Sequence, residues 1–226
     1  MYEIKGFLET SFIDWPGKIC SVLFLPHCNF RCLYCHNHSL VLSSEQYATL
    51  PVEGILDHLA SFRDWVDGIC LTGGEPTLHP DLLSLIRKVK GPGFLVKLDT
   101  NGSYPERLER LIERREVDFV SMDVKAPLEP GPYARITGSA VDLDALWRSI
   151  RILEGGGVDH EFRMTVVPGF HSIDDVRRLG RQLKAGPRVV LQSFNPENPL
   201  DPSLKGRRPY EAERLRALER GIRRMT

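Results

Sequence analysis

The sequence predicts an α/β fold, and within that class a partial (β/α)6 barrel of parallel strands. Short apolar runs alternate with amphipathic stretches from residue 19 onward, a pattern typical of repeated βα units. The chain has 226 residues, fewer than the usual eight-unit barrel of about 250. Polar and glycine-rich clusters follow the apolar runs, as expected where βα loops carry the chemistry.

Each predicted strand is an apolar run bounded by turn-forming or charged residues. Cys20 and Cys70 lie inside the first two runs, and we expect both to be buried, because a free cysteine usually behaves as a small hydrophobic residue. The predicted strands span roughly residues 19–25, 68–72, 94–99, 117–123, 161–167 and 188–194.

Helices are predicted between the strands from apolar residues three or four positions apart. The first three follow Pro51, Pro80 and Pro105, because proline favours the first turn of a helix. The fourth ends at the glycines 155–157, and a fifth spans about 173–183. The first four apolar stripes are Leu56, Leu59, Phe62 and Val66; Leu82, Leu85, Ile86 and Val89; Leu108, Leu111 and Ile112; and Leu143, Leu146, Ile150 and Leu153.

A basic amphipathic helix is predicted at about 210–224, where Leu215, Leu218 and Ile222 recur at helical spacing. We expect it to pack on a single domain, residues 1–226, with a solvated basic face; a docking surface for a partner protein is the alternative. The proline-rich stretches at 127–132 and 196–209 are expected to be mobile loops.

Composition argues against several classes of function. Thirty Lys and Arg residues balance thirty Asp and Glu residues, so we expect neither a nucleic-acid partner nor an anionic membrane. The longest apolar run, 19–25, is too short to span a bilayer, and no leader pattern opens the chain, so we expect a cytoplasmic protein. The five cysteines are an odd number, which argues against a disulfide framework.

The most informative motif is the triplet Cys28, Cys32 and Cys35. A loop of this length can fold its three sulfurs onto one face, and soft thiolates favour an iron–sulfur cluster or zinc. An electron-transfer cluster would use four thiolates. Three thiolates on a four-iron cluster leave one iron open, and an open iron can bind a substrate.

The alternative to a cluster is a structural zinc site. His27, His36 or His38 could complete its four ligands. Zinc sites usually draw their ligands from two separated pairs rather than from one tight triplet, so we prefer the cluster.

Further candidate residues follow the later strands. Because the C-terminal ends of parallel strands meet at one rim, we expect these residues to surround the cysteine loop. Glycines allow a backbone to approach a ligand closely, although a plain turn at the Gly-Gly pair or a loop hydrogen bond at Asp99 is the structural alternative. The candidates are Gly73, Gly74 and Glu75; Asp99 and Thr100; Asp123 and Lys125; Arg163; and Asn195.

With these motifs the chain resembles radical S-adenosylmethionine (SAM) enzymes. More narrowly, it resembles the anaerobic ribonucleoside-triphosphate reductase activating proteins, which are related to the pyruvate formate-lyase activating enzymes. The resemblance covers nearly the whole length and includes Tyr34, the aromatic residue before the last cysteine. It implies one [4Fe–4S] cluster held by Cys28, Cys32 and Cys35. The open iron would bind the amino and carboxylate groups of SAM, and one electron would release a 5′-deoxyadenosyl radical.

The resemblance also implies roles around SAM. Glu75 would accept hydrogen bonds from its amino group, Lys125 would pair with its carboxylate, and Arg163 would contact SAM. Asp99 and Asp123 would lie near the SAM carboxylate, and two acids there need a cation or hydrogen-bond donors between them; the related activating enzymes place a monovalent cation at this point. The remaining predicted contacts are Tyr34, Gly73, Gly74, Thr100 and Asn195.

Two positions depart from the pyruvate formate-lyase activating enzymes. Asn195 stands where those relatives have a histidine that contacts SAM, and Ser121 replaces a sulfur-bearing residue.

The implied function is the formation of a glycyl radical on a partner enzyme, the anaerobic ribonucleotide reductase, with flavodoxin or ferredoxin as the low-potential electron donor. The compactness of the chain favours this, since little beyond the core remains to shape a small-substrate pocket. One alternative is a radical SAM enzyme that acts on a small molecule or another peptide. Another is a non-catalytic iron–sulfur or zinc protein.

Overall fold

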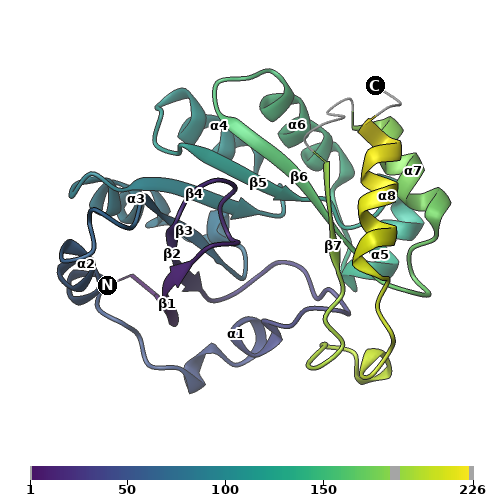
Figure 1. Cartoon of the computed structure of the whole chain (residues 1–226), viewed down its shortest axis with the longest axis horizontal. Helices are drawn as coiled ribbons and strands as arrows, with labels where there is room; N and C mark the ends of the chain where they lie inside the picture. Colours follow the sequence, from purple (N-terminus) through teal and green to yellow (C-terminus); the bar gives the residue numbers. More distant parts are fainter. Residues whose placement is uncertain (1, 184–188, 224–226) are drawn as a thin grey trace.

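The protein, described here as a computed structural model over residues 2–183 and 189–223, is built on one open, mostly parallel sheet (Figure 1). The first strand pairs antiparallel with the second, and every later neighbouring pair is parallel. Because β1 and β7 are the two edges, the barrel is not closed, which confirms the predicted partial barrel. In sheet order the described strands are β1 (Gly6–Ser11), β2 (Cys20–Leu25), β3 (Gly68–Gly73), β4 (Leu95–Thr100), β5 (Phe119–Asp123), β6 (Asp159–Val166) and β7 (Val189–Ser193).

The six predicted strands are confirmed as β2 to β7, although residue 188 of the last prediction lies outside the described residues. The prediction missed β1. This strand carries Leu8, Glu9 and Thr10 on its exposed part, and so lacks the continuous apolar run that marks the buried strands. It adds to the edge of the sheet by antiparallel pairing with β2.

Helices pack against the outer face of the curved sheet, and the inner face is left open toward the viewer of Figure 1. The five predicted helices before the C-terminal one are confirmed: those after Pro51, Pro80 and Pro105, the one that ends before the glycines 155–157, and the one at 173–183. The α-helices are α1 (His38–Leu42), α2 (Val52–Ala60), α3 (Leu82–Lys90), α4 (Pro105–Glu113), α5 (Pro130–Thr137), α6 (Leu143–Glu154), α7 (Ile173–Gln182) and α8 (Ala212–Arg223). Short 3₁₀ turns lie at η1 (Ser44–Gln46), η2 (Pro76–Leu78) and η4 (Pro202–Leu204).

Two helices were not predicted. The five-residue α1 is too short to show a period, and α5 begins inside the stretch at 127–132 that we expected to be a mobile loop. Pro130 stands in the first turn of α5, where its missing N–H costs nothing. Gly138 ends the helix in the left-handed conformation.

Alternate side chains of the strands point to the two faces of the sheet. Leu23 and Leu25 of β2 join the large core under the helices. Cys20 and Val22 point to the inner face and pack with Cys70 and Trp15, so both cysteines are fully buried, as predicted. Apolar packing therefore fills the inner face near the start of the strands and leaves their C-terminal ends for polar groups.

The predicted amphipathic helix is confirmed as α8, although residue 224 lies outside the described residues. It runs beside β7 and α7 (Figure 1) and buries Leu215 and Ile222. Glu219 accepts a hydrogen bond from the backbone N–H of Leu191, at 2.6 Å, and so caps part of the free edge of β7. In the stretches that the structure describes, no helix has the length and apolar content that a bilayer crossing requires.

Candidate functional site

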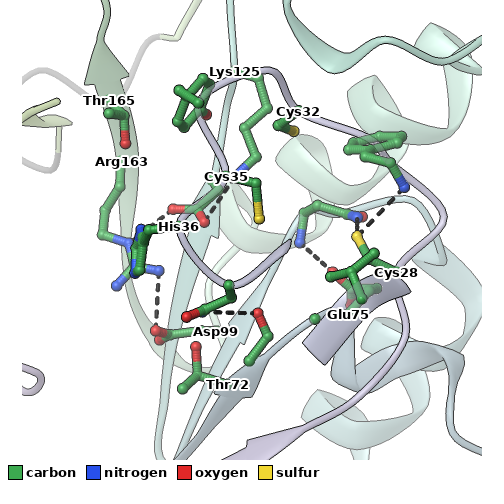
Figure 2. A pocket seen from close by; sticks show the side chains of 18 of the residues that line it. Cys28, Cys32, Cys35, His36, Thr72, Glu75, Asp99, Lys125, Arg163 and Thr165 are labelled. Carbon is green, nitrogen blue, oxygen red and sulfur yellow. Dashed lines mark hydrogen bonds and ion pairs between the residues drawn. The ribbon is translucent and has the colours of Figure 1, made fainter. Parts of the chain in front are cut away.

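A cavity of about 480 Å³ opens at the C-terminal ends of the strands (Figure 2), within the usual size range of ligand pockets. The structure brings all the predicted site residues together around it, while the group that each one binds stays a prediction. The predicted residues that line the cavity are Cys28, Cys32, Tyr34, Cys35, Gly73, Gly74, Glu75, Asp99, Thr100, Asp123, Lys125, Arg163 and Asn195.

The cysteine loop follows β2 and crosses one side of the cavity (Figure 2). Backbone hydrogen bonds hold it on the end of α5: Arg31 N donates to Thr137 O at 2.9 Å, and Leu33 N donates to Ile136 O at 3.1 Å. The loop is therefore anchored by its main chain, and its cysteine side chains remain free thiols.

The three thiols of this loop form a soft donor set. Burial raises the pKa of Cys28 to about 11 and that of Cys32 to about 12, so a thiolate at either position needs a bound cation. Among the residues that the structure describes, no group of three or more His, Cys, Asp or Glu side chains is arranged to hold a single metal ion, whereas in an iron–sulfur cluster each thiolate binds a different iron. His36, one of the zinc ligands considered above, lines the cavity, whereas His27 pairs with Glu3 at 3.8 Å.

The two glycines after β3 allow a close approach of two backbones. A Cβ on Gly73, where φ is +111°, would overlap the carbonyl oxygen of Leu25, and one on Gly74 would overlap that of His27. The N–H of Gly74 donates to Leu25 O at 2.8 Å, and the N–H of Glu75 donates to His27 O at 2.7 Å. The glycines thus fix the start of the cysteine loop against the rim.

Glu75 is almost completely buried, and both of its carboxylate oxygens accept hydrogen bonds from the protein. Its Oε1 accepts from the N–H and hydroxyl of Thr77 and from the hydroxyl of Thr100, and its Oε2 accepts from the N–H of Asn101 at 2.6 Å. This carboxylate joins the loops that follow β3 and β4. Its predicted contact with the SAM amino group would add to these bonds.

A chain of ion pairs runs along the cavity from Asp99 through Arg163 to Lys125, whose side chain lies beside Cys32 and Cys35 (Figure 2). Arg163 from β6 lies between two acids: its Nη2 is 3.0 Å from Asp99 Oδ2, and its Nε donates to Asp123 Oδ1 at 2.9 Å. Lys125 Nζ contacts Asp123 Oδ2 at 2.9 Å, and Lys97 Nζ pairs with Asp99 Oδ1. Burial alone would raise the pKa of Asp123, but Arg163 and Lys125 hold it well below its usual range.

Sequence reasoning missed Lys97. Its side chain is fully buried, on the same face of β4 as Asp99 two residues later. A lysine inside the apolar run 94–98 was the signal that could have identified it, because a fully buried lysine needs a charged partner.

Three other residues of the sequence analysis differ in their burial and in their hydrogen-bond partners. The Tyr34 hydroxyl is buried and has no hydrogen-bond partner among the described residues. Asn195 is exposed, and its Oδ1 accepts from the N–H of Glu197 at 3.0 Å. Ser121 is buried and donates to Glu161 Oε1 at 2.7 Å.

Residues 22–183 match the profile of the radical SAM superfamily. The chain belongs to this superfamily. It is 32% identical over 206 residues to a protein of Methanocaldococcus jannaschii whose name assigns it to the glycyl-radical enzyme activating enzymes, a match that covers 89% of this chain and 84% of that protein. The pyruvate formate-lyase-activating enzyme of Streptococcus mutans is 31% identical over 185 residues, which cover 76% of this chain and 68% of that enzyme.

Solved structures share the fold. Streptococcus suis SuiB bound to S-adenosylmethionine aligns with a TM-score of 0.61 at 16% identity, over 90% of this chain and 45% of that one. The low identity limits this likeness to the fold.

The protein is therefore a radical SAM enzyme with a [4Fe–4S] cluster and SAM as its cofactors. The site fits them: three free thiols on one loop suit iron, and the unpartnered Tyr34 hydroxyl marks a place for a polar group. A monovalent cation between Asp99 and Asp123 does not fit, because Arg163 already pairs with both acids.

Proposed function

We propose that this radical SAM enzyme forms a glycyl radical on a partner enzyme, and that the partner is the anaerobic ribonucleoside-triphosphate reductase. The relatives named as glycyl-radical enzyme activating enzymes support the first part. The observation that carries the proposal is the meeting of the cysteine loop and the charged residues of β4, β5 and β6 around one cavity.

In this proposal Cys28, Cys32 and Cys35 hold the cluster. When bound, the cluster and SAM supply a 5′-deoxyadenosyl radical, which removes a hydrogen atom from the target glycine. The protein positions the reacting groups and keeps water away from them. A low-potential donor such as flavodoxin or ferredoxin supplies the electron.

The remaining predicted residues orient SAM. Arg163 and Lys125 lie where a carboxylate would find positive charge, and Glu75 would accept from an amino group. The same cavity is lined by Tyr34, Gly73, Gly74, Thr100 and Asn195. Asp99 and Asp123 hold Arg163 in place through ion pairs. We also propose that residues 1–226 form a single radical SAM domain.

The test is the transfer of the radical. The anaerobically reconstituted and reduced protein is mixed with SAM and the anaerobic reductase, and electron paramagnetic resonance is recorded. We expect a glycyl-radical doublet on the reductase. A doublet on pyruvate formate-lyase instead would keep the activating function and change the partner, whereas SAM cleavage without a radical on either enzyme would contradict the proposal.

Two cysteine variants complete the experiment. Cys32→Ala removes a proposed cluster ligand, so we expect it to remain folded, to lose the four-iron cluster and to lose activity by more than about 100-fold. Cys20→Ala removes a buried thiol of β2 that packs with Trp15 and Cys70 and does not line the cavity, and it should keep the cluster. Iron and sulfide analysis separates the two; a Cys32→Ala protein that holds four irons and cleaves SAM would refute the ligand assignment.

A further inference from the structure

The two acids on the charged side of the cavity are already paired with cations of the chain. Asp99 is paired with Lys97 and Arg163, and Asp123 is paired with Arg163 and Lys125. Two other acids lie near this network: Glu75 lines the same cavity, and the charge of Glu161 also acts on Arg163. A metal cation at Asp99 and Asp123 would therefore compete with the cations that these carboxylates already hold.

Lys97 is the least accessible member of the network. Its side chain is 0% exposed, and the side chain of Asp99 is 9% exposed. Lys97 Nζ also lies 3.8 Å from the Cys70 sulfur on the neighbouring strand. Burial disfavours the charged form of the lysine, but the Asp99 carboxylate outweighs it and raises the pKa of Lys97. The residue is thus an ammonium ion fixed beneath Asp99.

Two side chains of the protein stand where a bound metal cation would neutralise the acids. Lys97 Nζ pairs with Asp99, and the Arg163 guanidinium lies between Asp99 and Asp123 and pairs with both. Both acids are mostly shielded from solvent, with side chains 9% and 28% exposed, and a buried carboxylate is stable only with such partners.

We propose that Lys97 and Arg163 replace the monovalent metal ion at this acid pair, so that Asp99 and Asp123 need no added cation when SAM binds. Lys97 is a positioning residue in this proposal: it acts through Asp99, which in turn orients Arg163. The inference uses SAM as the cofactor but does not depend on which partner enzyme receives the radical.

The test is the dependence of the apo protein on monovalent cations. Melting temperatures are measured in potassium, sodium or tetramethylammonium chloride at equal ionic strength. We expect the wild-type protein to melt at the same temperature in all three salts. A specific stabilisation of the wild type by potassium or sodium would overturn the proposal.

Lys97→Ala removes the built-in cation and leaves room for a metal ion beside Asp99. We expect its melting temperature to rise by about 3–5 °C for each tenfold increase in potassium or sodium above the dissociation constant, and not in tetramethylammonium. Lys97→Met removes the charge but fills the space, and should gain nothing from any cation. Equal melting of Lys97→Ala in all three salts would refute the role of Lys97.

Lys90→Ala is the matched control. It removes a lysine that pairs with Asp118 at 2.9 Å, and neither residue lines the cavity. We expect no difference between the three salts for this variant. SAM binding by the reconstituted wild type gives a second readout: its dissociation constant should change less than about twofold between potassium and tetramethylammonium. Neither readout requires a glycyl radical, so a failure here is distinguishable from a failure of the proposed function.

Discussion

The two sides of the cavity prepare for their ligands in different ways. The sulfur wall, defined by Cys28, Cys32 and Cys35, lies on a loop whose side chains remain free thiols. The charged wall, defined by Lys97, Asp99, Asp123, Lys125 and Arg163, lies on or just after three neighbouring strands, and its members pair with one another.

The proposed function accounts for this difference, because it assigns iron to the sulfur wall and the SAM carboxylate to the charged wall. Cysteine ligands must be available to iron, so the protein anchors their loop through the main chain instead. An organic carboxylate is recognised by cations that are already fixed in place, and fixing buried cations requires carboxylate partners within the protein. The charged wall is therefore expected to contribute to stability before any cofactor binds, whereas the sulfur wall is not.

The largest effect is expected at the centre of the charged wall. Arg163→Met would leave Asp99 and Asp123 without their shared partner, and losing one member of a buried ion-pair network typically costs about 3–5 kcal/mol. Urea denaturation of the apo protein measures this loss. A change below about 1 kcal/mol would show that the charged wall does not stabilise the fold.

Arg148→Met provides the control for this variant. Arg148 also bridges two acids, Glu106 and Glu109, but its side chain is 43% exposed. Water and salt screen such a pair, so we expect a loss of at most about 1 kcal/mol. If both arginine variants lose the same stability, burial is not what distinguishes the charged wall.

A second prediction concerns the stability of the fold at acidic pH. His171 lies in the loop after β6, where its Nδ1 accepts a hydrogen bond from the N–H of Val167 at 2.9 Å, and burial lowers its pKa to about 4. The neutral form is thus favoured in the folded state. Between pH 6.5 and 4 the unfolded chain takes up a proton that the folded chain does not, so the stability should fall by about 3 kcal/mol as the pH decreases.

Denaturation curves across this pH range test the assignment. His171→Asn retains a side-chain acceptor and removes the titration, so its stability should change less between pH 6.5 and 4. His58→Asn alters a histidine whose side chain is 47% exposed, and should keep the wild-type pH dependence. A His171→Asn protein with an unchanged slope would assign the acid sensitivity to other groups.

Much of the fold and of the site could be predicted because the relevant signals are local. Buried parallel strands such as β2 are nearly continuous apolar runs. A pair of glycines such as Gly73 and Gly74 marks a loop where the backbone has a positive φ or a close contact that other residues do not allow. The edge strand β1 was missed because half of its residues face solvent. The local signal for Lys97, a lysine inside an apolar run, was overlooked, and the pairing of its partner Asp99 with Arg163 joins residues 64 positions apart, which no local pattern reports.

Roles were harder to predict than positions. We expected Gly73 and Gly74 to let the backbone approach a ligand. In the structure they let the loop after β3 pack closely against the backbone of Leu25 and His27. Glu75 was expected to face SAM, and it also joins two rim loops. Such contacts depend on residues more than 20 positions away, so no local pattern reports them.

The smallest effect is expected at the support of the sulfur wall. Gly74→Ala would push a Cβ into the carbonyl oxygen of His27, next to Cys28, and overpacking of this kind costs roughly 1–3 kcal/mol. Gly221→Ala in α8 is the control, since its new Cβ would meet no described atom within 4 Å outside its chain neighbours and its own helix backbone; it should be neutral or slightly stabilising. Because the clash displaces the loop itself, Gly74→Ala should also lower the iron content after reconstitution. A normal iron content despite the lost stability would mean that the sulfur wall adapts to its cluster and is not pre-shaped by the rim.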